Sequence, residues 1–291
     1  MGQAVVGQQS KEPGGRSRLW LSKDIFHVLK EKTGTPTVEG IVLDLLETKE
    51  VECHPEAFYQ MVNLRLLKVH NVRLPEGLNR LPNSLRFLEW GGYPLQYLPS
   101  GFDPDELVEL SMCHSRIEQL WNGKKNFDKL KIITVSHSKS LTRTPDFEGI
   151  QNLEGLDLEG CESLVEIHFS IGTLKKLSFL TLKDCESLEL LPDEIEMEHL
   201  EVLVLSGCSS IKRIPNFVEP MEHLRKLSLD GTGESILSSV EHLTSLSLLD
   251  LRDCKNLKCL PSAIGNLRAV KSFDVSGCSN LLPNCQKASG N

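Results

Sequence analysis

Apolar residues recur along the chain in a short phrase of the form L-x-x-L-x-L, in which some leucines are replaced by other apolar residues. Within the phrase, the L-x-L core alternates apolar and variable positions, which is the period of a strand with one buried face. Ten clear copies begin 21 to 24 residues apart, at Leu64, Leu85, Leu107, Leu130, Leu153, Leu177, Leu200, Leu224, Leu246 and Val270. A less regular copy, VEGIVLDL, begins at Val38. The pattern therefore predicts ten or eleven short strands, one in each repeat.

A tight turn follows each strand, and a small polar residue closes it. In six consecutive repeats this slot holds Cys161, Cys185, Cys208, Thr232, Cys254 and Cys278. The regular spacing predicts a structural role, in which the side chain faces inward and bonds the backbone of the turn. A ladder of metal ions or disulfides is the alternative, because stacked repeats would bring these cysteines close together. Zinc sites, however, need a second ligand pair at short spacing such as C-x-x-C, and the sequence has none.

Repeats of this length and composition are the signature of a leucine-rich-repeat solenoid. We predict an α/β fold with a curved parallel sheet on the concave face and short helices, turns and loops on the convex face. The repeats should occupy residues 38–281, followed by an irregular tail over 282–291. Residues 1–37 differ in pattern, and SKDIFHVLKEKTG predicts a short helix with Ser22 as N-cap and Gly34 as stop signal. We interpret this first segment as the end of another domain.

On the predicted sheet, the variable residues beside the L-x-L leucines point toward the concave face. Four apolar residues at such positions fall on neighbouring repeats and are bordered by charged residues, so we expect an exposed apolar strip. We name the whole set the concave strip: Phe179, Val202, Val204, Lys226, Asp230, Leu248, Asp250 and Arg252. Exposed apolar patches with a polar border often mark contacts with another protein. The alternative is that a repeat sheet tolerates scattered apolar residues on this face.

Charge and composition narrow the classes of partner. The 291 residues carry a formal net charge of −8. This argues against a general nucleic-acid or anionic-membrane binder, because both need a concentrated basic face. No run of about 18 apolar residues predicts a membrane-spanning helix. The N-terminus lacks the apolar core of a signal peptide and N-x-S/T sequons are absent, which favours an intracellular address.

No group of residues predicts catalysis. The nine histidines are scattered without metal-ligand spacing, and the Gly-Lys-Lys of WNGKKNFDKL lacks the first glycine and the Ser/Thr of a phosphate loop. Asp250 and Asp274 should be neighbours on the sheet, but an open sheet offers no cleft for acid–base chemistry. We therefore expect a binding module with no catalytic residue, no metal and no cofactor in this chain.

Several longer stretches carry a more specific signal than the repeat alone. They include EPGGRSRLWLSKDIFHVLKEKTGTPTVEGIVLDL, the run LPNSLRFLEWGGYPLQYLPSGFDPDELVELSMCHSRIEQLWNG around Trp90 and Trp121, and NLEGLDLEGCESLVEIHFSIGTL. Over about residues 1–281 the sequence resembles the C-terminal part of plant TIR–NB–LRR disease-resistance proteins, which are intracellular immune receptors. Residues 1–37 resemble the tail of the nucleotide-binding and winged-helix module together with its linker.

The resemblance implies a repeat region that senses a pathogen effector or a guarded host protein. It also implies that the repeats hold the receptor's own nucleotide-binding module in its resting state, and that the address is cytoplasmic or nucleo-cytoplasmic. The TIR NADase and the ADP/ATP switch of the family have no counterpart in these residues, so we expect no enzyme activity in this chain. A second hypothesis is a truncated, repeat-only protein that acts as an adaptor or decoy without signalling.

Overall fold

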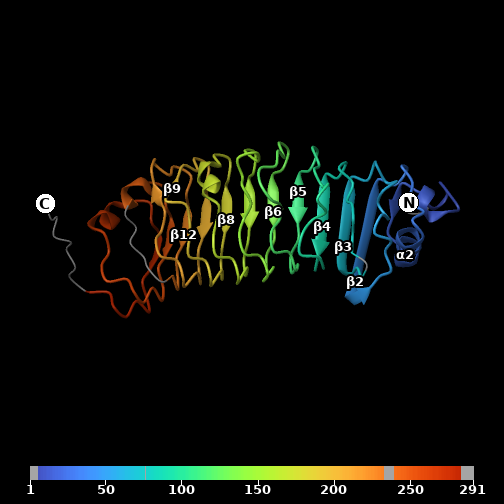
Figure 1. Cartoon of the computed structure of the whole chain (residues 1–291). Coiled ribbons are helices and arrows are strands. Elements are labelled where there is room, and N and C mark those ends of the chain that lie inside the picture. The colour runs from blue at the N-terminus through green and yellow to red at the C-terminus, as the bar shows by residue number, and fades with distance from the viewer. Residues whose placement is uncertain (1–5, 76, 233–238, 283–291) are drawn as a thin grey trace.

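The computed structural model describes residues 6–75, 77–232 and 239–282. Within these residues, twelve parallel strands lie side by side in one row and form a single sheet, as Figure 1 shows. They are β1 (Arg18–Leu19), β2 (Gly40–Glu50), β3 (Leu66–Arg73), β4 (Phe87–Gly91), β5 (Glu109–Ser111), β6 (Ile132–Thr134), β7 (Gly155–Asp157), β8 (Phe179–Thr181), β10 (Val202–Val204), β12 (Lys226–Ser228), β13 (Leu248–Asp250) and β14 (Ser272–Asp274). The predicted solenoid is confirmed, and each of its turns is called a coil below.

Helices are short in the described part of the chain. The α-helix α2 (Ser22–Glu31) precedes the repeats. Single 3-10 turns complete some of the coils, and a small two-stranded sheet forms away from the main one. These elements are η1 (Pro13–Gly15), η2 (Phe169–Thr173), η3 (Val240–His242), η4 (Ser262–Asn266), β9 (Glu194–Ile195) and β11 (Asn216–Phe217). The convex side is thus built mainly from turns and loops.

The repeat strands pair in the same register from coil to coil. Val202 of β10 lies between Phe179 of β8 and Lys226 of β12, and Lys226 in turn pairs with Leu248 of β13. Neighbouring strands in a sheet lie about 4.8 Å apart. Each coil therefore adds one side chain to each column of the concave face, at regular intervals along the molecule. In β2, a bulge shifts the register between Asp44 and Lys49.

The repeating leucines form one continuous core behind the sheet. Leu156 and Leu180, at the centres of β7 and β8, are 1% and 3% exposed. The first leucine of each phrase, such as Leu153 or Leu177, is fully buried. Burying a leucine stabilises a fold by roughly 1.5–3 kcal/mol before the entropy of ordering is counted. The same contribution recurs in the coils up to β13, which explains why the phrase is repeated. In the coil of β14, the central residue Phe273 is 44% exposed.

The cysteine slot joins each coil to the one before it. The thiols donate hydrogen bonds of 2.9 to 3.4 Å to carbonyl groups at strand ends, from Cys161, Cys185, Cys208, Cys254 and Cys278 to Val135, Leu158, Leu182, Leu229 and Leu251 respectively. The hydroxyl of Thr232 lies 3.6 Å from the Cys254 sulfur. The acceptor thus belongs to the preceding coil, whereas we expected a bond within the same turn. A buried strand-end carbonyl needs such a partner because water cannot reach it.

The N-terminal segment covers one end of the repeat array. Helix α2 buries Ile25, Val28 and Leu29, and β1 adds a parallel strand to the sheet by pairing Arg18 with Gly40. The sheet therefore crosses the boundary that we placed between residues 37 and 38. Of the expected tail over 282–291, all but residue 282 lies outside the described residues.

Both predicted boundaries of this helix differ from the structure. The N-cap is Leu21, and Ser22 is the first helical residue. The helix ends at Glu31, and its C-cap Lys32 takes the left-handed conformation with φ 55°. Gly34 serves close packing instead, because a Cβ atom there would meet the Met61 methyl at 2.1 Å. The prediction that Gly34 stops the helix is therefore wrong, because Lys32 takes that role and Gly34 packs against Met61.

Candidate functional site

The concave strip is assembled from four adjacent strands and the turns that follow them. The column just before the middle of each strand carries Phe179, Val202, Lys226 and Leu248 in register on β8, β10, β12 and β13. Across four strands, this column spans about 14 Å at the spacing of a sheet. The geometry therefore brings together residues that lie up to 69 positions apart in the sequence.

Exposure differs among the apolar members of the strip. Phe179 is 39% exposed, and Val202 and Leu248 are half-buried. Val204 is only 9% exposed, so the expectation that it is an exposed member of the strip is wrong. Its register neighbours Thr181 and Ser228 are buried as well. In these three coils the middle column is therefore buried, whereas Phe179, Val202 and Lys226 in the column before it are exposed or half-buried.

Charged residues at one edge of the strip are already paired. The Arg252 guanidinium donates to both carboxylate oxygens of Asp250, with Nη2–Oδ2 at 2.8 Å and Nε–Oδ1 at 3.0 Å. This contact raises the pKa of Arg252. Arg252 also lies 3.9 Å from Asp274 on the next coil. Asp230 accepts a hydrogen bond from the Ser206 hydroxyl. A partner must therefore compete with these contacts before it can use Arg252, Asp250 or Asp230.

Lys226 differs from Arg252 because its charge is not paired with a carboxylate of the described residues. Within the described residues its ammonium group has neither an ion pair nor a hydrogen bond, and the side chain is exposed. Its register neighbours are the apolar Val202 and Leu248. The strip is thus an apolar surface with one available positive charge at its centre, which suits a partner that presents an acidic group among apolar ones.

The sequence analysis missed a second apolar patch on the same face. Val42, Leu66 and Phe87 are 36%, 38% and 41% exposed, and Leu66 pairs with Phe87 in register. Leu66 and Phe87 stand in the same column as Phe179, so their exposure could have been predicted from the repeat alone. The predicted strip included only the apolar residues of β8, β10 and β13 in this column.

A charge cluster borders this second patch. Glu89 accepts a hydrogen bond from Lys68 at 3.0 Å and contacts the His70 ring at 2.8 Å. Partial burial disfavours the ionised carboxyl group, but these two basic neighbours outweigh burial and lower the pKa of Glu89. The carboxylate is therefore ionised and held in place at neutral pH.

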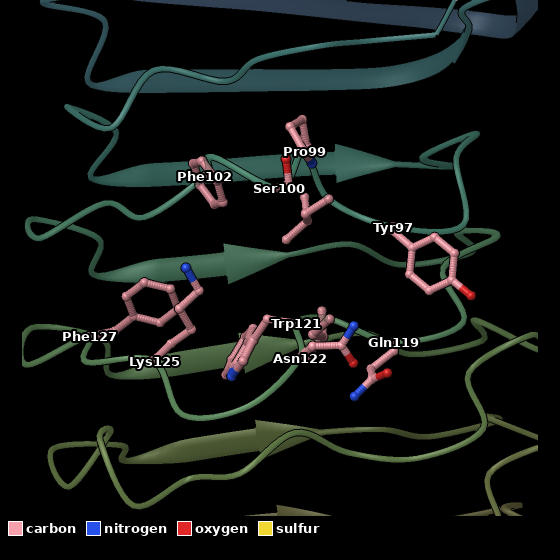
Figure 2. Close-up of a pocket in the computed structure, with 11 residues that line it drawn as sticks. Tyr97, Pro99, Ser100, Phe102, Gln119, Trp121, Asn122, Lys125 and Phe127 are labelled. Carbon is pink, nitrogen blue, oxygen red and sulfur yellow. The ribbon is translucent and has the colours of Figure 1, made fainter.

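A hollow of about 350 Å³ lies between the coils that follow β4 and β5. Figure 2 shows Pro99 and Phe102 on one coil and Trp121 and Phe127 on the next. The Trp121 ring packs edge-on against Phe127, with centroids 5.3 Å apart at 82°. The volume is at the lower end of that found in small-molecule pockets. Trp121 marked the family resemblance in the sequence, but the hollow could not be predicted because it forms between coils.

The described residues contain no group of three or more His, Cys, Asp or Glu side chains placed to hold a metal ion. None of the described helices has the length and apolarity that crossing a membrane requires.

Comparison with known proteins gives related sequences along nearly the whole chain. A model of the Leucine Rich Repeat family matches residues 106–125. The chain is 43% identical to the disease resistance protein RPP2A of Arabidopsis thaliana over 271 residues, which is 90% of this chain and 20% of that protein. It is 41% identical to the disease resistance-like protein DSC1 of the same plant, over 91% of this chain and 22% of that protein. The TMV resistance protein N of Nicotiana glutinosa is 36% identical, over 97% of this chain and 24% of that protein.

Solved repeat structures align with most of the chain at lower similarity. The leucine-rich repeat domain of the type III effector XopL has 18% identity and a TM-score of 0.49, over 89% of this chain and 75% of that one. The plant peptide hormone receptor RGFR1, in complex with RGF2, has 14% identity and a TM-score of 0.49, over 94% of this chain and 48% of that one.

The fold and the concave sheet define the class of this molecule as a leucine-rich-repeat protein. Its relatives define the family more narrowly. The chain belongs to the plant TIR–NB–LRR disease-resistance proteins, in which it corresponds to the leucine-rich-repeat region. It spans about a fifth to a quarter of the length of the relatives named above.

Proposed function

We propose that this chain is the ligand-sensing repeat region of an intracellular plant disease-resistance receptor, and that it binds a pathogen effector or a guarded host protein through the concave strip. The observation that supports the proposal is the column of Phe179, Val202, Lys226 and Leu248. It places one exposed and two half-buried apolar side chains around a lysine that has no ion pair within the described residues. Phe179 would act as an aromatic anchor, and Lys226 would pair with an acidic group of the partner.

The same surface can carry a switch. A ligand shifts a conformational equilibrium only by its difference in affinity for the two states. We propose that the repeats contact the receptor's nucleotide-binding module in the resting state, and that partner binding to the concave strip favours the released state. In this proposal, ADP or ATP binds to that other module, and the chain itself has no enzymatic role. The receptor acts in the cytoplasm, or in both the cytoplasm and the nucleus.

The test is a binding assay of purified chain variants against candidate effector and host proteins. Lys226→Glu should weaken binding of the true partner by about tenfold or more, because reversing the charge replaces an attraction by a repulsion among apolar contacts. Phe179→Ala should weaken it by a similar factor through lost apolar contact. Lys258→Glu is the matched control, since this exposed lysine lies outside the strand columns. Full affinity in both strip variants would contradict the proposal.

The alternative is a repeat-only protein that serves as an adaptor or decoy. An immunoblot of the source tissue, with an antibody raised against residues 150–260, separates the two. A band several times heavier than 32.5 kDa supports the receptor. A band near 32.5 kDa supports the adaptor or decoy, in which partner binding by the concave strip carries no attached signalling module.

A further inference from the structure

A polar pocket of about 410 Å³ lies at the carboxyl ends of strands β2 to β5. It is separate from the concave strip and from the hollow at Trp121. Its basic residues are Arg73 at the end of β3, and His114 and Arg116 in the turn after β5. Glu50, at the end of β2, is the one carboxylate among the described residues that line it.

Both arginines are without partners. Within the described residues, the guanidinium groups of Arg73 and Arg116 make no ion pair and no hydrogen bond. This differs from many basic side chains of the solenoid, which pair with an acid on the next coil, as Lys131 does with Glu154 at 2.6 Å. Glu50 is the register partner of Arg73, yet the two side chains do not form an ion pair. Two guanidinium groups therefore have all their donors available.

The coil between the two arginines leaves the space between them open. Arg73 and Arg116 belong to coils that are two steps apart, which corresponds to about 10 Å along the sheet. The intervening coil lines the pocket with Gly92, which has no side chain, and Pro94. Gly92 has φ +73°, so a larger residue would be strained at that position. An extended arginine reaches far enough for both guanidinium groups to contact one small ligand between them.

His114 adds a third nitrogen donor to the same wall. It also takes a left-handed conformation, with φ 55°, and its ring stacks on that of His137 at 5.0 Å between centroids. The stacking fixes the orientation of the imidazole beside Arg116. Among the described residues, the lining thus combines two flexible guanidinium groups and one imidazole held in place with a single carboxylate.

We propose that this pocket binds the phosphate group of a small phosphorylated molecule. A guanidinium donates two parallel hydrogen bonds to a phosphate, and two guanidinium groups on opposite sides can share its oxygens. A phosphate dianion balances the excess positive charge of the pocket more fully than a single carboxylate does. The recess admits a compact ligand, while the net charge of −8 on the chain disfavours a long polyanion.

Isothermal titration calorimetry of the purified chain with inorganic phosphate and pyrophosphate, at constant ionic strength set with sodium chloride, tests the proposal. The wild-type chain should bind both, and pyrophosphate more tightly because it offers more oxygens. Arg73→Ala with Arg116→Ala should weaken binding by about tenfold or more, given the strength of hydrogen bonds between charged groups. Arg73→Lys with Arg116→Lys should give intermediate affinity, because an ammonium group cannot form the paired contact.

The matched control is Arg213→Ala with Arg268→Ala, which removes two exposed arginines from other coils and should leave the affinity unchanged. Circular dichroism verifies that each double variant is folded. Absence of phosphate binding by the folded wild-type chain would overturn the proposal. So would equal affinity in the wild type and the Arg73/Arg116 double variant, or binding of citrate or a short oligonucleotide without binding of phosphate and pyrophosphate.

Discussion

Cys161, Cys185 and Cys208 occupy the same position in three successive coils, and their environments are nearly identical. Each side chain is fully buried, and each thiol donates to a carbonyl of the preceding coil. Burial raises the pKa of Cys161 and Cys208 from 9.0 to about 12, and it raises the pKa of Cys185 as well. These thiols are therefore kept neutral and serve as hydrogen-bond donors, not as nucleophiles.

The raised pKa values make stability depend on alkaline pH. The folded state favours the protonated thiol, so this contribution to stability is complete below about pH 9 and is lost as the pH rises from 9 toward 12. Each such thiol should lower the free energy of unfolding by about 1.4 kcal/mol per pH unit in that interval. Urea unfolding at several pH values measures the slope. Cys208→Ser keeps a donor that does not titrate there, so its slope should be smaller, and equal slopes would contradict the argument.

At the residue scale, the sequence predicted which residues share a column of the sheet better than it predicted their burial and ion pairs. The period of the repeat gave every column of the concave face, including the register of Phe179 with Val202. The burial of Val204 and the pairing of Arg252 with Asp250 could not be read from it. Burial depends on the packing of side chains from neighbouring strands, and ion pairs depend on side-chain conformations. The alternation of apolar positions determines neither.

At the scale of the element, the coil is defined by close backbone contacts as much as by leucines. Gly149 lies in the loop that precedes β7, and its carbonyl accepts a hydrogen bond from the Phe127 amide at 3.1 Å. A Cβ atom at this position would meet the Lys125 carbonyl oxygen at 2.0 Å. A backbone atom cannot move aside as a flexible side chain can. The glycine therefore lets two successive coils approach each other.

Gly149→Ala should lower the free energy of unfolding by about 1–3 kcal/mol, because the coils must separate to admit the methyl group. Gly265→Ala is the control, since a Cβ atom there meets no other atom within 4 Å. Chemical denaturation of the two variants against the wild type provides the comparison. A Gly149→Ala protein as stable as the Gly265→Ala protein would show that the coils are not in such close contact.

Element boundaries were harder to predict than the elements themselves. The strands follow from the alternation of apolar positions and were found by it. The extension of β2 to Glu50, and of β3 to Arg73, was not predicted, because their pairing continues past the repeat phrase through a bulge. The phosphate pocket that we propose, like the hollow at Trp121, is lined by residues of different coils. Such sites depend on stacking, which no single repeat specifies.

At the scale of the molecule, the solenoid is a chain of local contacts in which each coil packs mainly on its two neighbours. Figure 1 shows α2 at one end of the row of strands and β12 toward the other. A loss of packing at one end should therefore destabilise the coils nearest to it and leave the distant ones intact. This differs from a globular domain, in which one core residue affects the whole structure.

Ile25→Ala tests this locality. Ile25 is fully buried in α2, and its truncation should cost about 2–4 kcal/mol. Hydrogen exchange of the backbone amides should become faster in β1, β2 and β3 and remain unchanged in β12, β13 and β14. Leu21→Ala provides the control, because Leu21 is 51% exposed. Uniformly faster exchange along the whole sheet would mean that the array unfolds as one unit.

The common register of the strands has a consequence for how such a surface diversifies. Leu66 and Phe87 form one apolar patch on the concave face, and Phe179 and Val202 form another in the same column, with three coils between the two patches. Duplication or deletion of one intervening coil would change their separation by about 4.8 Å, while the residues within each patch keep their neighbours across the sheet. Unequal recombination between repeats could thus alter the size of partner that spans both patches in a single genetic event, without any substitution in either patch.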